Sequence, residues 1–142
     1  MAENNAACVF CRIANGAEPN STLFEDEQHI VFLDKRPVFL GHSLVVPKPH
    51  HETLYDLPAE AIGPLFKLAQ KIGKSVERGM GAEGSFIAIN NIVSQSVPHL
   101  HIHIIPRIKG DGLRGFFWPR QQYMSNEQLL EIQEKIKKFI EE

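Results

Sequence analysis

The chain has 142 residues, a length typical of one domain with a substantial hydrophobic core. Hydrophobic residues make up 43% of it, charged residues 23%, and the net charge of −2 argues against a broad electrostatic grip on DNA or RNA. No apolar run approaches the roughly 20 residues that span a bilayer, and the start of the chain has no basic cluster typical of a signal peptide. We therefore expect residues 1–142 to form one cytoplasmic domain that binds neither nucleic acid nor membrane, with a loose start at 1–7.

Three short strands are predicted in the first third of the chain, at 21–25, 29–33 and 43–46. A polar turn separates the first two strands. Pro47 and Pro49 end the third strand, because proline cannot donate to a β-ladder.

A long helix is predicted after Pro58, since proline suits the first turn of a helix. Apolar residues recur at spacings of three and four along one face: Ile62, Leu65, Ala69, Ile72 and Val76. Pro64 lacks a backbone donor, so the helix is expected to begin late or to bend there. Gly79 and Gly81 are expected to end it.

Two more strands and a second helix are predicted in the rest of the chain. The strands cover 86–89 and 99–105, and Pro106 is expected to close the second one. A long loop follows within the C-terminal segment 108–142, and Ser125 and Gln128 have the spacing of a helix capping box. An apolar stripe continues that helix at Leu129, Ile132, Ile136 and Phe139. Strands joined mostly by short links, with two helices, predict an antiparallel α+β fold.

Three histidines alternate with apolar residues in the strand predicted at 99–105. His99, His101 and His103 should share one accessible face, and the backbone positions of neighbouring histidines should be about 6.6 Å apart. Close imidazoles disfavour one another's protonation, so some stay neutral near pH 7 and keep a lone pair for attack on phosphorus or for a metal. A three-histidine catalytic metal site and a merely solvated strand face are the alternatives.

Cys8 and Cys11 are the only cysteines of the chain. In a reducing compartment, a Cys-x-x-Cys pair indicates a metal or redox site more than a structural disulfide. A closed zinc site would need two histidines in addition. A thiol redox site would need a strand–helix–strand unit around the first cysteine, which the pattern does not indicate, and two buried cysteines are the remaining interpretation.

The histidine pattern at 99–105 resembles the signature of the histidine triad (HIT) family. The resemblance extends over most of the chain, through Cys8–Ile13, Phe32–Asp34, Gly41–Lys48 and Gln95–Pro98. It implies a HIT-like fold with a five-stranded antiparallel sheet and two main helices, usually assembled as a homodimer. The cysteine pair is similar to that of a zinc-containing bacterial branch of the family.

This resemblance implies a hydrolase that cleaves at the α-phosphorus of nucleoside phosphoramidates or dinucleoside polyphosphates. His101 would attack phosphorus and form a covalent nucleotidyl-histidine, and water would then release the nucleoside monophosphate. His103 would contact the phosphate and the departing group, and Ser96 would donate a hydrogen bond to them. The alternative is a nucleotide-binding sensor or carrier with little turnover.

The resemblance also implies an adenine nucleotide site with several further residues: Asp34, Phe10, Ile13, Phe32, Asn90, Gln95 and His42. Asp34 would accept the ribose hydroxyls, although a turn residue is the other interpretation of it. The two phenylalanines and Ile13 would form the base slot, with ordinary core packing as their alternative. Asn90 would add a contact to the phosphate, Gln95 belongs to the motif that precedes the triad, and His42 would support the wall of the site.

A structural zinc is implied by the related uridylyltransferases, in which two cysteines and two histidines hold the metal. The corresponding residues here are Cys8, Cys11, His50 and His99, with His51 as a possible replacement for His50. Four protein ligands leave no open position for a substrate, so this metal would support the fold.

Trp118 is the only tryptophan and stands in an aromatic, glycine-flanked segment. The resemblance implies that this segment reaches the nucleotide pocket of a partner subunit in the homodimer. Arg114 and Arg120 would then meet distal phosphates of the substrate. The alternative is that these aromatic residues cover the chain's own core.

Overall fold

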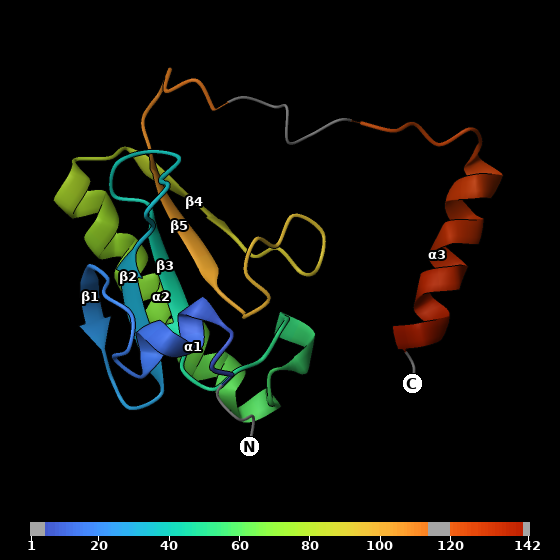
Figure 1. Ribbon diagram of the computed structural model, residues 1–142. Coiled ribbons are helices and arrows are strands. Elements are labelled where there is room, and N and C mark those ends of the chain that lie inside the picture. The colour runs from blue at the N-terminus through green and yellow to red at the C-terminus, as the bar shows by residue number, and fades with distance from the viewer. Residues whose placement is uncertain (1–4, 114–119, 141–142) are drawn as a thin grey trace. The chain divides into compact units, whose positions relative to one another are not determined.

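A computed structural model describes residues 5–113 and 120–140 (Figure 1). The chain divides into two compact units, Met1–Asp111 and Gly112–Glu142. Among the described residues, every helix is too short or too polar to cross a membrane. Whether 1–142 behaves as a single domain stays a prediction.

The first unit is built on a five-stranded antiparallel sheet with the strand order β1-β2-β3-β5-β4 (Figure 1). The strands are β1 (Thr22–Glu25), β2 (His29–Leu33), β3 (Ser43–Pro47), β4 (Gly84–Ala88) and β5 (Ile102–Arg107). The predicted α+β class and five-stranded antiparallel sheet are confirmed, and the predicted strands are correct to within about three residues at each end.

Helix α2 (Ala59–Met80) covers one face of this sheet (Figure 1). Its apolar stripe includes Leu65 and Ile72. The stripe packs in one buried cluster with residues of the sheet and of the segment before β5: Val31, Val45, Leu100, Ile102 and Ile104. The expectation that Pro64 would delay or bend the helix start is wrong in its first part, because α2 begins at Ala59 and continues through Pro64. A proline inside a helix costs about 3 kcal/mol. Burial of several large apolar side chains, at roughly 1.5–3 kcal/mol each, outweighs that cost.

The short helix α1 (Val9–Ala14) covers the opposite face of the sheet (Figure 1). Its buried side chains are Phe10, Cys11 and Ile13. They pack against the residues of β2 and β3 that point away from α2, which are Ile30, Phe32, Leu44 and Val46. Cys8 is the N-cap, and its sulfur accepts from the backbone N–H of Cys11 at 3.5 Å. The sequence did not indicate this helix, because six residues are too few for a clear apolar period and cysteine is an unusual cap.

The triad enters the sheet later than predicted. β5 begins at Ile102, and its ladder to β3 covers Ile102 to Ile104. The backbone N–H of Leu100 donates instead to the carbonyl of His51 at 2.6 Å. Pro106 lies inside β5, where it pairs with β4, beyond the end of the β3 ladder. The proline therefore removes no hydrogen bond to β3, and the prediction that it closes the strand is wrong.

The second unit contains helix α3 (Asn126–Ile140). The backbone N–H of Gln128 donates to Ser125 Oγ at 3.0 Å, as the capping-box spacing predicts, while Gln128 Oε1 accepts from Met124 N at 2.7 Å. None of the α3 side chains is buried. Trp118 and Arg114 fall in 114–119, outside the described residues.

Candidate active site and metal cluster

A cavity of about 310 Å³ opens on the α1 face of the sheet. Seven of the residues predicted for catalysis or nucleotide binding line it: Phe10, Ile13, Phe32, Asp34, Ser96, His101 and His103. The lining combines apolar side chains with imidazole, carboxylate and hydroxyl groups. This combination suits a ligand with a flat apolar part and a charged part.

Three predicted binding residues do not line this cavity. The side chain of Asn90 donates to the Ser94 carbonyl at 3.3 Å. Gln95 accepts from Ile92 N at 3.2 Å and donates to the Glu52 carbonyl at 2.6 Å. Both amides therefore shape the loop that carries Ser96. The third residue, His42, is buried, and its Nε2 lies 2.9 Å from Nδ1 of His103.

Other lining residues were missed by the sequence reasoning: Val9, Asn20, Leu33, Lys35, Arg36, Leu44 and Val97. Most of them are direct neighbours in sequence of residues that were predicted. Lys35 and Arg36 directly follow Asp34 in the chain, so the prediction of Asp34 as a site residue could have been extended to them. Asn20 precedes β1, and the sequence held no signal that would place it here.

The histidines of the triad are more buried than predicted. His99 is 0% and His101 3% exposed, so the expectation of an accessible histidine face is wrong for these two residues. Phe10 on α1 covers them, with its ring centroid 5.9 Å from that of His99 and 5.0 Å from that of His101. Only His103 of the three is partly exposed.

The tautomer of His101 follows from one hydrogen bond. Its Nδ1 lies 2.7 Å from the backbone carbonyl oxygen of His99, and a carbonyl can only accept. The proton of the neutral ring is therefore on Nδ1, and the lone pair is on Nε2. Burial lowers the pKa of His101, against the opposing effects of the His99 carbonyl and of Asp34, so the ring is neutral near pH 7.

A second chain of hydrogen bonds fixes the tautomers of His42 and His103. Val38 N–H donates to His42 Nδ1 at 3.0 Å, so the proton of His42 is on Nε2. That Nε2–H donates to His103 Nδ1 at 2.9 Å, which leaves a proton on Nε2 of His103. Burial, followed by the charges of His101 and His42, lowers the pKa of His103 to about 4 despite the opposing effect of Asp34.

Asp34 makes the contact of a turn residue and also lines the cavity. Its Oδ1 accepts from the backbone N–H of Arg36 at 2.9 Å, as expected of a turn residue. Its Oδ2 lies 3.6 Å from His42 Nε2, and the residue lines the cavity. Each carboxylate oxygen has two lone pairs, so both can still accept from a ligand hydroxyl.

Cys8, Cys11, His50 and His99 form a cluster whose four ligand atoms lie within 4.8 Å of one another. His99 Nδ1 is 3.4 Å from the sulfur of Cys8 and 3.5 Å from that of Cys11, and His50 Nδ1 is 3.2 Å from the Cys11 sulfur. A tetrahedral zinc, with bonds of about 2.3 Å to sulfur and about 2.0 Å to nitrogen, holds such atoms about 3.5 Å apart. The spacing of the cluster therefore fits zinc.

The outer contacts of His99 also suit a metal ligand. Its Nε2 lies 2.8 Å from the carbonyl oxygen of Pro47 and must donate to it, so the lone pair is on Nδ1, the atom beside both sulfurs. His51 does not join the cluster, although its backbone carbonyl holds Leu100.

Asp34, His42 and His103 also bring three ligand-type atoms within 4.8 Å. In this group, however, the Val38 N–H occupies Nδ1 of His42 and keeps a proton on Nε2, the atom that would have to bind a metal. The group is therefore suited to hydrogen bonding, in contrast to the cysteine cluster.

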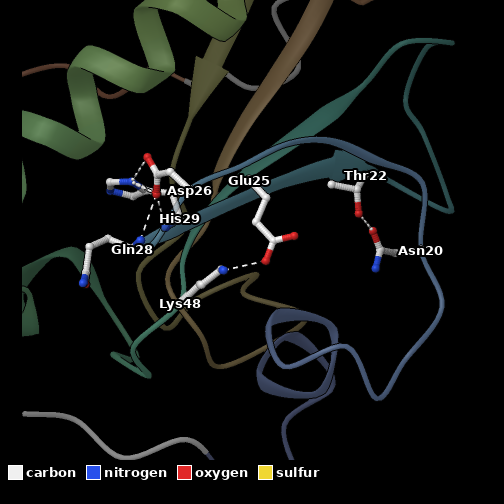
Figure 2. A network of polar contacts seen from close by, with 7 residues as sticks. All are labelled: Asn20, Thr22, Glu25, Asp26, Gln28, His29 and Lys48. Atoms are coloured by element: carbon white, nitrogen blue, oxygen red, sulfur yellow. Dashed lines mark hydrogen bonds and ion pairs between the residues drawn. The ribbon is translucent and has the colours of Figure 1, made fainter.

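A polar network holds the β1–β2 hairpin, which leads into Phe32 and Asp34 (Figure 2). Asp26 Oδ1 accepts from the backbone N–H groups of Gln28 and His29 at 2.9 and 2.7 Å and contacts the His29 ring at 3.1 Å. Burial acts to raise the pKa of Asp26, but the hydrogen bonds from His29 and Gln28 prevail and lower it. Figure 2 also shows Lys48 paired with Glu25 and the Thr22 hydroxyl bonded to Asn20.

Residues 15–110 match the family model described as the HIT domain. The chain belongs to the HIT family. An uncharacterised HIT-like protein of Methanocaldococcus jannaschii is 40% identical over 107 residues, which are 74% of this chain and 82% of that protein.

Two further similar proteins carry informative names. The adenosine 5′-monophosphoramidase hnt1 of Schizosaccharomyces pombe is 35% identical over 115 residues, covering 80% of this chain and 84% of that enzyme. A crystal structure of a zinc-bound histidine triad protein from Mycobacterium smegmatis is 36% identical, with a TM-score of 0.72, covering 87% of this chain and 89% of that one.

Proposed function

We propose that this HIT protein is a nucleotide hydrolase that cleaves at the α-phosphorus of nucleoside phosphoramidates or dinucleoside polyphosphates. The observation that carries the proposal is the hydrogen bond between His101 Nδ1 and the His99 carbonyl. It places the lone pair of a neutral ring on Nε2, on a residue that lines the cavity. The name of the yeast relative supports phosphoramidates as one substrate class.

In the first step, His101 Nε2 attacks the α-phosphorus and forms a phosphorus–nitrogen bond. The bond to the leaving group breaks, and that group leaves with the electron pair and takes a proton from water. The His101 ring keeps its Nδ1 proton and becomes cationic in the adduct. The His99 carbonyl, which already accepts that proton, and the carboxylate of Asp34 stabilise this charge.

In the second step, water attacks the same phosphorus and the phosphorus–nitrogen bond breaks. The electron pair returns to His101, a proton goes to solvent, and the nucleoside monophosphate is released. His103 donates from Nε2 to the phosphate or to the leaving atom, because His42 occupies its Nδ1. Ser96, which lines the same cavity, donates a hydrogen bond to the phosphate or to the leaving atom.

The remaining lining residues suit the nucleoside. Phe10, Ile13 and Phe32 provide an apolar slot for the base, which we propose to be adenine. Asp34 accepts the ribose hydroxyls. Asn90 and Gln95 act through the loop that carries Ser96, and His42 acts through His103.

We further propose that Cys8, Cys11, His50 and His99 hold a structural zinc ion. Zinc would supply fixed bonds between α1, the segment after β3 and the segment before β5. The spacing of the four ligand atoms and the zinc-bound relative support this proposal.

The experiment is a single-turnover reaction with an adenosine phosphoramidate and with a diadenosine polyphosphate, quenched with denaturant and analysed by mass spectrometry. We expect a transient adduct of one nucleoside monophosphate on His101, followed by free monophosphate. Tight binding of adenosine monophosphate with no adduct and no turnover on either substrate would instead identify a sensor or carrier.

A further inference from the structure

His99 takes part in both the metal cluster and the nucleophile's hydrogen bond. Its ring nitrogen Nδ1 faces the sulfurs of Cys8 and Cys11, and its backbone oxygen accepts the Nδ1 proton of His101 at 2.7 Å. One residue therefore connects the proposed metal with the atom that determines where the His101 lone pair lies. We propose that metal binding at this cluster sets the tautomer of His101, with His99 as the positioning residue.

This inference rests on the proposed metal and on the proposed role of His101. His99 lies before β5 begins, outside the ladder that fixes His103. Its backbone N–H bonds to Val97, the residue two positions before it, and its ring Nε2 bonds to the Pro47 carbonyl. Without a metal, its Nδ1 side has only imidazole–sulfur contacts of 3.4 and 3.5 Å, which are weak compared with metal–ligand bonds.

The consequence for His101 follows from the chemistry of imidazole. The hydrogen-bond partners of the two ring nitrogens decide which nitrogen carries the proton. When the carbonyl of His99 moves away, the Nδ1–H form of His101 loses its partner, and the Nε2–H form becomes populated. That form has no lone pair on Nε2 and cannot attack phosphorus from there.

His103 provides an internal control within the same site. Its tautomer depends on His42 and, through it, on the Val38 N–H, and neither residue belongs to the metal cluster. Both histidines face the same cavity, and their ring centroids are 4.8 Å apart. A metal effect through His99 changes the tautomer of His101 alone, whereas general loosening of the site changes both.

The test is long-range proton–nitrogen NMR on the ¹⁵N-histidine-labelled full chain at neutral pH, without substrate. Spectra are compared for zinc-loaded protein and for protein treated with a chelator. We expect His101 to change from the Nδ1–H form to a mixture, with His103 unchanged. An even mixture halves the competent fraction, so turnover should fall about twofold or more while adenosine monophosphate still binds.

Two variants at one position sharpen the test. Cys11→Asp keeps a zinc ligand and should keep His101 in the Nδ1–H form. Cys11→Ala removes the ligand and should give the mixture of His101 tautomers. If chelation unfolds the chain, His50→Ala is studied at low and at saturating zinc, and the His103 signals report the folded fraction. His101 remaining in the Nδ1–H form in folded, metal-free protein would overturn the inference, as would equal changes at His101 and His103. Because no substrate is present, this result is independent of whether the hydrolase proposal holds.

Discussion

Phe10 stands edge-on against His101, with the ring planes at 90° and the centroids 5.0 Å apart. The same phenylalanine packs edge-on against Phe32 at 5.4 Å. Helix α1 thus holds the proposed nucleophile and the proposed base slot with one side chain. Aromatic pairs in this arrangement are worth about 0.5–1.5 kcal/mol beyond their buried area.

Phe10→Leu should therefore lower kcat by about tenfold, because the His101 ring loses the surface that orients it for attack. Phe32→Leu is the matched control, since Phe32 contacts Phe10 and lines the slot. It should raise KM and leave kcat nearly unchanged. Steady-state kinetics on one adenosine phosphoramidate measures both values, and identical changes in the two variants would contradict this assignment.

His101→Ala should lose at least about a thousandfold in turnover and still bind adenosine monophosphate, because the covalent path is removed while the binding groups remain. Calorimetric titration and single-turnover kinetics check the two parts. If His101→Ala turned over normally while His103→Ala was inactive, the nucleophile would have been assigned to the wrong histidine.

Protein purified without added metal should contain about one zinc per chain, because the four ligand atoms form a closed site. Cys8→Ser should lower the Tm more than it lowers the activity of the molecules that stay folded, since such a site contributes to folding. Elemental analysis and thermal denaturation provide the measurements. A metal-free protein of full stability would refute the zinc site.

The contact between Asp26 and His29 should make stability depend on pH in acid. The folded state lowers the pKa of Asp26 below its ordinary value of 3.8, so the charged carboxylate favours folding. This contribution is complete above about pH 4 and is lost as the pH falls through the lower folded pKa. Urea denaturation of the wild type and of Asp26→Asn should show a stability difference that disappears in that window. A difference that stays constant down to pH 2 would be evidence against a role for the charge.

Trp118 should influence the choice of leaving group through a homodimer. We expect light scattering to give the mass of a dimer, and Trp118→Ala to alter the ranking of substrates more than the affinity for a nucleoside monophosphate. Substrates that share adenosine and differ in the leaving group make the comparison. A monomer in solution, or equal losses on every substrate, would count against this role.

Helix α2 was predictable from its apolar stripe, and the strands from short apolar runs bounded by turn residues. The ends of β5 were not predictable, because its ladders to β3 and to β4 cover different residues. The burial of His99 and His101 was not, because it depends on α1, whose six residues form a helix only through packing against the sheet. His50 and His51 could not be told apart from the sequence either. They are adjacent and chemically identical, and only the path of the chain after Pro49 decides which ring meets Cys11.

The two core clusters lie on opposite faces of one sheet, and this separation affects how the protein tolerates change. Val31 and Val45 belong to the α2 side, and Phe32 and Leu44 belong to the α1 side with the cavity. Substitutions that lie more than about 7–10 Å apart and share no contacts usually add in free energy, which applies to residues of α2 itself and not to neighbours along one strand. Stabilising replacements in the core under α2 can therefore raise the free energy of unfolding. This gain offsets destabilising replacements on the α1 side that alter specificity. Along β5, residues that pack into the core under α2 alternate with residues that face the cavity. A shift of the β5 register by one residue would therefore disrupt the core and the cavity at once.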